Sequence, residues 1–181
     1  DVAQDAATNN NTAATQVSVI YDITGPTVTV NQAGSDPTNT LPIVFDVVFS
    51  ENTTNFIATD VTMGGTATGV TFNVSGGGTT YAINVTTITG AGTLIPSLAA
   101  GVAMDAAGNG NSASTSTDNT VTYDNVGPTV TVNQAGTQTD PTNTLPIKFD
   151  VVFSEAVASF VAGDVTMGGT ATGVTFNISG A

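Results

Sequence analysis

Ile43-Val-Phe-Asp-Val-Val-Phe-Ser50 is the stretch that decides the fold, because apolar side chains occupy every second position. Ile, Phe, Val and Phe would face one way, while Val, Asp, Val and Ser would face the other. A β-strand with one face in a hydrophobic core gives this period of two. The stretch returns as Ile147-Lys-Phe-Asp-Val-Val-Phe-Ser154, and its single substitution, Val44 to Lys148, falls on the outer face. The alternation therefore predicts a half-buried strand in both copies.

The repeat extends outward from this strand in both directions. Asp60 to Asn73 return letter for letter as Asp164 to Asn177, and Pro26 to Gly34 return as Pro128 to Gly136. The period of about 100 residues is the size of a small domain and too long for one turn of a solenoid. We therefore expect three regions: the C-terminal part of a preceding repeat at 1–24, a complete repeat at 25–125, and the N-terminal part of a following repeat at 126–181.

Short strands are expected throughout the repeat, and no window shows a helical period. Clusters of Gly, Asn, Asp, Pro and Ser separate the apolar runs, as turns separate strands. About seven strands in about 100 residues is typical of an immunoglobulin-like sandwich. We predict an all-β protein of tandem immunoglobulin-like β-sandwich domains, with a small antiparallel barrel as the alternative. Besides the strand quoted above, the expected strands are Thr27–Asn31, Asp60–Met63, Val70–Val74, Tyr81–Thr87, Thr93–Leu98 and Thr120–Tyr123. The expected core includes Ile43, Phe45, Val47, Phe49, Phe72, Tyr81 and Leu98.

The composition excludes several classes of partner. Hydrophobic residues make up 40% of the chain, which suffices for a core despite the net charge of −13. Lys148 is the only basic residue, so the chain lacks the side chains that bind nucleic acid or an anionic membrane surface. No apolar run is long enough to span a bilayer, so we expect no membrane insertion in this segment. Cysteine is absent, which excludes disulfides and thiolate chemistry.

The residues that catalysis requires are also missing. Nucleophilic catalysis by Ser or Thr needs a base, and the chain has no His and no Cys. Lys148 is replaced by Val44 in the other copy, so no function common to the repeats can depend on it. Two carboxylates can hydrolyse a glycoside, but sugar clefts usually contain Trp, which is absent. We therefore predict that the protein is not an enzyme and has no catalytic residues.

Acidic side chains are the remaining candidates for chemistry. In a seven-strand sandwich, alternate loops gather at the same end. This would bring four side chains together where the chain enters the complete repeat: Asp22, Glu51, Asp105 and Asn109. The equivalent set one repeat later would contain Asp124 and Glu155. Oxygen ligands without nitrogen or sulfur suit Ca²⁺, so these six residues are the predicted ligands of interdomain calcium sites.

Simpler roles for the acids remain open. Surface carboxylates keep a protein with so few basic residues soluble, and Asp105 in Asp-Ala-Ala-Gly-Asn can shape a turn through its side chain. Asp60 is expected to accept hydrogen bonds from backbone amides in a short turn. Asp36 is expected to act in a turn as well, because Asp-Pro favours turn initiation.

Five segments follow one another in a specific order along the repeat: Pro26-Thr-Val-Thr-Val, Phe45-Asp-Val-Val-Phe-Ser-Glu51, Thr59-Asp-Val-Thr62, Gly101-Val-Ala-Met-Asp-Ala-Ala-Gly-Asn109 and Asn119-Thr-Val-Thr-Tyr-Asp124. In this order they resemble the bacterial immunoglobulin-like repeats of giant cell-surface adhesins, of the biofilm-associated-protein and gliding-adhesin types. The resemblance implies an extracellular location on the bacterial cell surface and a rod of many tandem domains. In related arrays, calcium at the domain junctions stiffens the rod, and the resemblance implies the same role here.

Two functions are compatible with these observations. The first is a structural stalk, or spacer, of a long adhesin that displays a distal binding region. The second is a self-assembling subunit of an extracellular sheath, surface layer or filament. The near-identity of the copies favours the spacer. The expected partners are neighbouring repeats of the same chain and, because near-identical domains can exchange strands, other copies of the protein.

Overall fold

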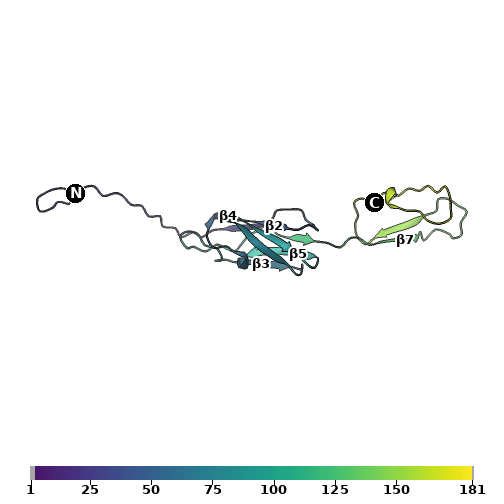
Figure 1. Ribbon diagram of the computed structural model, residues 1–181, viewed down its shortest axis with the longest axis horizontal. Helices are drawn as coiled ribbons and strands as arrows, with labels where there is room; N and C mark the ends of the chain where they lie inside the picture. Colours follow the sequence, from purple (N-terminus) through teal and green to yellow (C-terminus); the bar gives the residue numbers. More distant parts are fainter. Residues whose placement is uncertain (1–2, 181) are drawn as a thin grey trace. The chain divides into compact units, whose positions relative to one another are not determined.

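The computed structural model describes residues 3–180 and is all-β, with antiparallel sheets (Figure 1). The only helical elements among these residues are two short 3₁₀ turns, η1 (Ala58–Asp60) and η2 (Ala162–Asp164). No helix is long and apolar enough to cross a membrane within this range. Contacts divide the chain into two units, Asp1–Asn125 and Val126–Ala181, and each unit is described by itself.

One sheet of the first unit consists of β1 (Val28–Gln32), β2 (Ile43–Thr53) and β4 (Thr71–Thr87), in the order β1-β2-β4. β1 pairs with β2 from Val28 opposite Phe49 to Gln32 opposite Phe45. Consecutive residues of β2 alternate between buried and more exposed over Ile43–Ser50, which confirms the predicted alternation.

β4 covers two strands that the sequence predicts separately, and it turns back on itself between them. Asn84 Nδ2 donates to Asn73 Oδ1 at 3.1 Å, and the hydroxyls of Thr71 and Thr86 lie 3.3 Å apart. Residues near the start of β4 therefore lie beside residues near its end. Gly76 permits the reversal, because its φ of 106° favours glycine and an added Cβ would lie 2.5 Å from the Thr80 carbonyl oxygen.

The other sheet consists of β3 (Val61–Gly65), β5 (Gly92–Leu98) and β6 (Val121–Tyr123), in the order β3-β5-β6. Side chains of both sheets belong to one buried cluster, so the two sheets enclose a common core (Figure 1). The expected core residues Ile43, Phe45, Val47, Phe49, Tyr81 and Leu98 are all buried, whereas Phe72 is only half-buried.

The aromatic side chains of the core meet edge to face near the end of β2. The ring centroids of Phe49, Phe56 and Tyr81 lie 5.1–5.8 Å apart. Tyr81 is buried, and its hydroxyl donates to the Thr53 carbonyl oxygen at 3.1 Å. The phenol therefore satisfies its polar atom inside the core, which a buried tyrosine requires.

The edge of β1 that faces away from β2 is also paired. The Thr115 amide donates to the Val28 carbonyl oxygen at 3.0 Å, and the Val30 amide donates back to the Thr115 carbonyl oxygen at 3.0 Å. Thr115 forms a parallel bridge with Thr29. The segment between β5 and β6 therefore covers this edge of the sheet.

Two acids expected in turns differ in how they are used. Asp60 Oδ2 accepts the Ile57 amide at 2.8 Å in η1, as predicted. Asp36 Oδ1 instead accepts the amide of Thr122 in β6 at 2.7 Å. This bond joins the loop after β1 to the far end of the repeat, so the acid holds two distant segments together.

Residues 3–24 form no named strand, and nearly all of them are exposed. A single bridge joins Gln4 and Asn10 around the loop Asp5–Asn9. The prediction that this region is the end of a preceding repeat stays a prediction.

The second unit contains β7 (Val130–Gln134) and β8 (Phe149–Phe153), which pair antiparallel. Val130 lies opposite Phe153 and Gln134 opposite Phe149, the same register as in β1 and β2. Most of the apolar side chains of this pair are exposed. That residues 126–181 are the N-terminal part of a following repeat also stays a prediction.

Candidate metal centre

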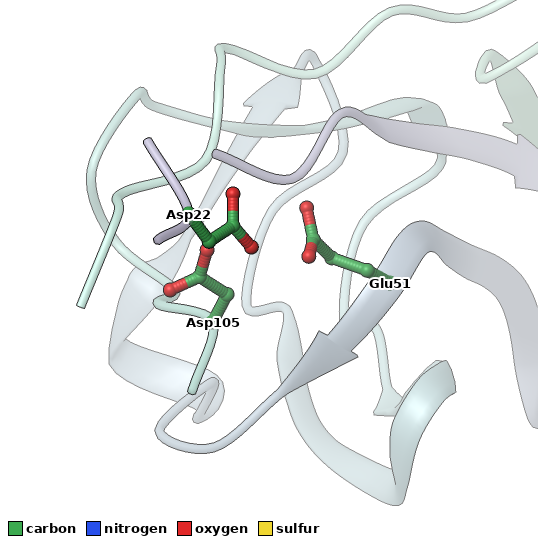
Figure 2. A group of neighbouring side chains, drawn as sticks. All are labelled: Asp22, Glu51 and Asp105. Atoms are coloured by element: carbon green, nitrogen blue, oxygen red, sulfur yellow. The ribbon is translucent and has the colours of Figure 1, made fainter. Parts of the chain in front are cut away.

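Three acidic side chains of the first unit converge near the start of β1. Asp22 lies in the segment before β1, Glu51 lies in β2, and Asp105 lies in the loop between β5 and β6. One carboxylate oxygen from each lies within 4.8 Å of the other two. Figure 2 shows the three carboxyl groups turned toward a common space. Segments far apart in the sequence therefore bring three formal negative charges together.

Asp105 is fixed by its own loop. Its Oδ1 accepts the amides of Ala107 and Asn109, each at 2.8 Å, and its Oδ2 accepts Asn109 Nδ2 at 2.8 Å. The side chain is 5% exposed. These hydrogen bonds favour the carboxylate, and the one from the Asn109 side chain contributes most to lowering the pKa of Asp105 below its ordinary value. Asp105 therefore stays charged and holds one orientation.

The loop Asp5–Asn9 forms the same bonds outside any sheet. Asp5 Oδ1 accepts the amides of Ala7 and Asn9, each at 2.9 Å, and Asn9 Nδ2 donates to Asp5 Oδ2 at 2.9 Å. The turn is therefore encoded locally, as the simpler interpretation of Asp105 predicts. Asp105 performs this role and also extends its carboxylate toward Asp22 and Glu51.

Glu51 has the opposite electrostatic environment. It was expected in a loop after the strand, but β2 continues to Thr53, so Glu51 belongs to the strand itself. Its carboxylate accepts no hydrogen bond from residues 3–180. Partial burial raises the pKa of Glu51, and the charges of Asp105 and Asp22 raise it further. Burial and the two neighbouring carboxylates therefore disfavour the charged form of Glu51.

Asn109 lies beside the cluster but presents its amide nitrogen to it. Asn109 Nδ2 donates to Asp105 Oδ2 at 2.8 Å and to the Asp22 carbonyl oxygen at 3.2 Å. The side chain thus joins the loop of Asp105 to the segment that leads into β1. In this orientation Asn109 positions Asp105 and Asp22, whereas a ligand would have to offer its oxygen. This positioning role is what the sequence interpretation missed.

The two remaining predicted ligands lie in different units. Asp124 directly follows β6 in the first unit, where its amide donates to the Thr38 carbonyl oxygen at 3.0 Å. Glu155 lies just after β8 in the second unit and is exposed. The prediction that they share a site stays a prediction.

The arrangement can hold a hard cation. Three carboxylates supply charged oxygen ligands, and Ca²⁺ takes six to eight oxygens, some of them from water or backbone carbonyls. The sequence places its only basic residue, Lys148, outside the first unit. No basic side chain of this unit can therefore neutralise the cluster. The donor set contains no nitrogen or sulfur ligand, which favours calcium over zinc or copper.

No family model, no curated protein and no solved structure matches this chain.

Proposed function

We propose that the protein is part of the structural stalk of a long repetitive bacterial cell-surface adhesin, built from tandem immunoglobulin-like domains that display a distal binding region. In this proposal a calcium ion bound by Asp22, Glu51 and Asp105 fastens the segment that leads into the domain. The observation that carries it is the convergence of these carboxylates from three distant segments. Bringing unneutralised charges together is unfavourable unless a cation binds them.

The strand order supports the immunoglobulin-like assignment. When β4 is taken as two strands joined by the turn at Gly76, the repeat has seven strands. Numbered from A to G, strands A, B, E and D then form one sheet, and C, F and G form the other. This is the distribution of a constant-type immunoglobulin domain.

The chemistry supports a structural role over an enzymatic one. The first unit has no His, Cys, Lys or Arg, so it lacks the side chains that most often activate a nucleophile or act as one near pH 7. Repeated segments that are identical over many residues suit a spacer, because the same domain can be used at each position. In the second unit, the pairing of β7 with β8 repeats the register of β1 with β2, which supports a domain-level repeat.

The position of Asp22 supports a mechanical role for the ion. Asp22 lies four residues before Pro26, at the point where the leading segment joins the domain. Its neighbours Asp105 and Glu51 are held by a loop and by a strand. A cation shared by all three would therefore restrict the direction in which residues before Asp22 leave the domain.

The test is thermal unfolding of the full chain in excess calcium and in chelator. Extracellular calcium modules have dissociation constants of roughly 10⁻⁴ to 10⁻³ M. At about ten times that concentration, one site adds about 1.4 kcal/mol to stability. The melting temperature of the first unit should then rise by several degrees, at roughly 4–8 °C per kcal/mol.

Glu51→Gln should remove most of this calcium response, and Asp46→Asn is the control. Asp46 is exposed on the outer face of β2 and does not belong to the cluster, so its substitution should leave the response of the first unit intact. Identical melting curves with calcium and with chelator would contradict the proposed ion. The spacer function would then be supported only by the repetition of the domain.

A further inference from the structure

Two of the four sheet edges in the first unit are covered by other segments. Thr115 bridges to the outer edge of β1. At the outer edge of β6, the Thr38 amide donates to the Thr122 carbonyl oxygen and the Asp124 amide donates to the Thr38 carbonyl oxygen, each at 3.0 Å. β3 ends this sheet on its other side, and no strand or bridge within residues 3–180 pairs with its outer edge. β3 thus presents an open edge, although β5 and β6 complete its sheet.

The backbone of β3 alternates between groups that bind β5 and groups that face the open edge. Met63 lies opposite Pro96 in β5, and a proline has no amide hydrogen to donate. The Pro96 carbonyl oxygen is turned the other way, where it accepts Asn119 Nδ2 at 2.9 Å. The amide and carbonyl of Met63 therefore face away from β5. In an antiparallel ladder every second residue does so, which adds the Val61 carbonyl and the Gly65 amide to the open edge.

The open edge also lacks the charges that protect many edge strands. Native proteins discourage pairing at an exposed edge with charged side chains, proline or bulges. The sequence of β3 is Val-Thr-Met-Gly-Gly, and no Asp, Glu, Lys or Arg occurs between Asp60 and Asp105. This uncharged run contains all of β3, β4 and β5. No charged side chain of β3 therefore opposes strand pairing.

The distribution of charge indicates what can occupy the edge. The chain carries a net charge of −13, so two copies repel each other where their carboxylates face. A side built from the uncharged run avoids this repulsion. A basic partner would instead be drawn to the acidic loops, because β3 offers it no carboxylate. The edge thus fits an uncharged strand, and the β3 of a second copy is such a strand.

We propose that two copies of the protein pair through β3, antiparallel about a two-fold axis at Met63. The Met63 amide of each copy donates to the Met63 carbonyl oxygen of the other, and the Gly65 amide of each donates to the Val61 carbonyl oxygen of the other. The Val61 amide takes no part, because it already donates to the Ala58 carbonyl oxygen. Strand addition of this kind gains main-chain hydrogen bonds along the edge. Both copies use the same surface, so association closes at a dimer.

The antiparallel register keeps the acids next to β3 apart. Thr62 of one copy lies opposite Gly64 of the other, so only small side chains meet on the outer face of the pair. Asp60 of each copy lies opposite Thr66 of the other, which separates the two Asp60 residues by about six residues of strand, roughly 20 Å. This exceeds the Debye length of about 8 Å at physiological salt. Repulsion between them is therefore largely screened.

The inference goes beyond the proposed stalk and has a consequence for it. The stretch Asp60 to Asn73, which contains β3, recurs unchanged as Asp164 to Asn177. In a tandem array every complete repeat presents the same edge, so weak pairings between two arrays add up. This lateral pairing of stalks rests on the proposed function, whereas the pairing of single chains does not.

The test is the mass of the full chain, measured by sedimentation equilibrium from low micromolar to near-millimolar concentration. The experiment is run in chelator, so that it is independent of the proposed calcium site. The wild-type chain should pass from monomer to dimer and grow no further. Amide hydrogen exchange locates the contact. The Met63 and Gly65 amides should exchange more slowly as the dimer forms, whereas the Thr62 amide, which faces β5, should change little.

Thr62→Asp tests the edge with a charge. Thr62 is exposed, and in the dimer the two Thr62 side chains are diagonal neighbours, with Cβ atoms about 7–8 Å apart. Two carboxylates at this distance repel, so the dissociation constant of the dimer should rise by about tenfold. Thr29→Asp is the matched control. Thr29 is an exposed threonine of β1, whose outer edge is already covered, so this variant should dimerise like the wild type.

Three results would overturn the proposal. The first is a wild-type chain that stays monomeric throughout. The second is association that leaves exchange of the Met63 amide unchanged, which would mean that copies meet through another surface. The third is a Thr62→Asp chain that dimerises as tightly as Thr29→Asp. Because both substituted side chains are exposed, circular dichroism of each variant should match that of the wild type and exclude unfolding as the cause.

Discussion

β1–β2 and β7–β8 are two copies of one strand pair, and they pair in the same register. Val28 faces Phe49 in the first unit as Val130 faces Phe153 in the second. The Thr27 amide donates to Ser50 Oγ at 3.0 Å, and the Thr129 amide donates to Ser154 Oγ at 2.9 Å. The copies differ in burial, because within residues 3–180 other strands cover only the first pair.

The comparison separates what a short sequence encodes from what a domain supplies. Register and turns depend on residues close to each other in the chain, so both copies form them. The 3₁₀ turns agree in the same way, since Asp60 accepts the Ile57 amide at 2.8 Å and Asp164 accepts the Val161 amide at 2.9 Å. Burial depends on strands contributed by β4, β5 and β6, which lie farther along the repeat.

Phe45→Ala should have the largest effect on this comparison. The Phe45 side chain is fully buried, and removing it leaves a cavity that costs about 3–5 kcal/mol. Because small domains are stable by only about 5–15 kcal/mol, the first unit should become marginal or unfold. The measurement is urea unfolding of the full chain, followed by the environment of the buried Tyr81 and Tyr123.

The matched variant is Phe149→Ala in the second unit, where the same side chain is 54% exposed. It should leave the unfolding midpoint of the first unit unchanged. Equal losses from the two substitutions would mean that the second copy is buried in solution, and the contrast between the units would then be wrong.

Asn31→Ala should have an intermediate effect. Asn31 Oδ1 accepts bonds from the backbone and side chain of Thr117, from the Asp118 amide and from the Ser116 hydroxyl, so it fastens the segment before β6 to β1. At about 0.5–1.5 kcal/mol for each net hydrogen bond, with losses partly offset by water, we expect a cost of roughly 1–3 kcal/mol. Urea unfolding measures this loss.

Asn133→Ala removes the same side chain from β7, where it accepts none of these bonds within residues 126–180. Its effect on the first unit should be nil, and hydrogen exchange at Thr115 and Thr117 should increase only for Asn31→Ala. Unchanged exchange in that variant would show that β1 holds its edge partner without the asparagine.

Much of the fold follows from the sequence because the strands are short and half-buried. The alternation in Ile43–Ser50 predicts which side chains of β2 enter the core, and the structure confirms it. Strand ends were harder to predict. Glu51 was expected in a loop because it is polar, but β2 continues past it to Thr53, which pairs with Gly78. That pairing depends on residues far along the chain, so a local pattern could not reveal it.

The candidate site, like the fold, was only partly predictable from the sequence. The order of loops places Asp22, Glu51 and Asp105 at one end of a sandwich, and the structure brings the three carboxylates within 4.8 Å of one another. The orientation of Asn109 could not be predicted in this way. Its amide nitrogen faces Asp105 and the Asp22 carbonyl oxygen because the loop and the leading segment happen to present two acceptors to it.

Glu51→Gln in chelator should have the smallest effect, and its sign is opposite to that expected in calcium. Burial and the neighbouring carboxylates raise the pKa of Glu51, so the folded unit binds this proton more readily than the unfolded chain. Lowering the pH through the raised pKa of Glu51 therefore stabilises the wild type. The whole of this added stability is present below the ordinary pKa of a glutamate. Asp105 acts oppositely at lower pH, because its pKa is lowered and its stabilisation is lost as the pH falls through that value.

The Gln variant lacks the charge that acidification removes. Without calcium it should melt slightly higher than the wild type at neutral pH, and the rise of its melting temperature on mild acidification should disappear. Asp46→Asn, which changes an exposed carboxylate on the outer face of β2, should keep the wild-type profile of the first unit. Melting temperatures recorded across this pH range, with calcium and with chelator, measure both effects. If Glu51→Gln melts lower than the wild type in chelator, Glu51 stabilises the unit by a contact of its own, and repulsion among the three carboxylates is not what calcium relieves.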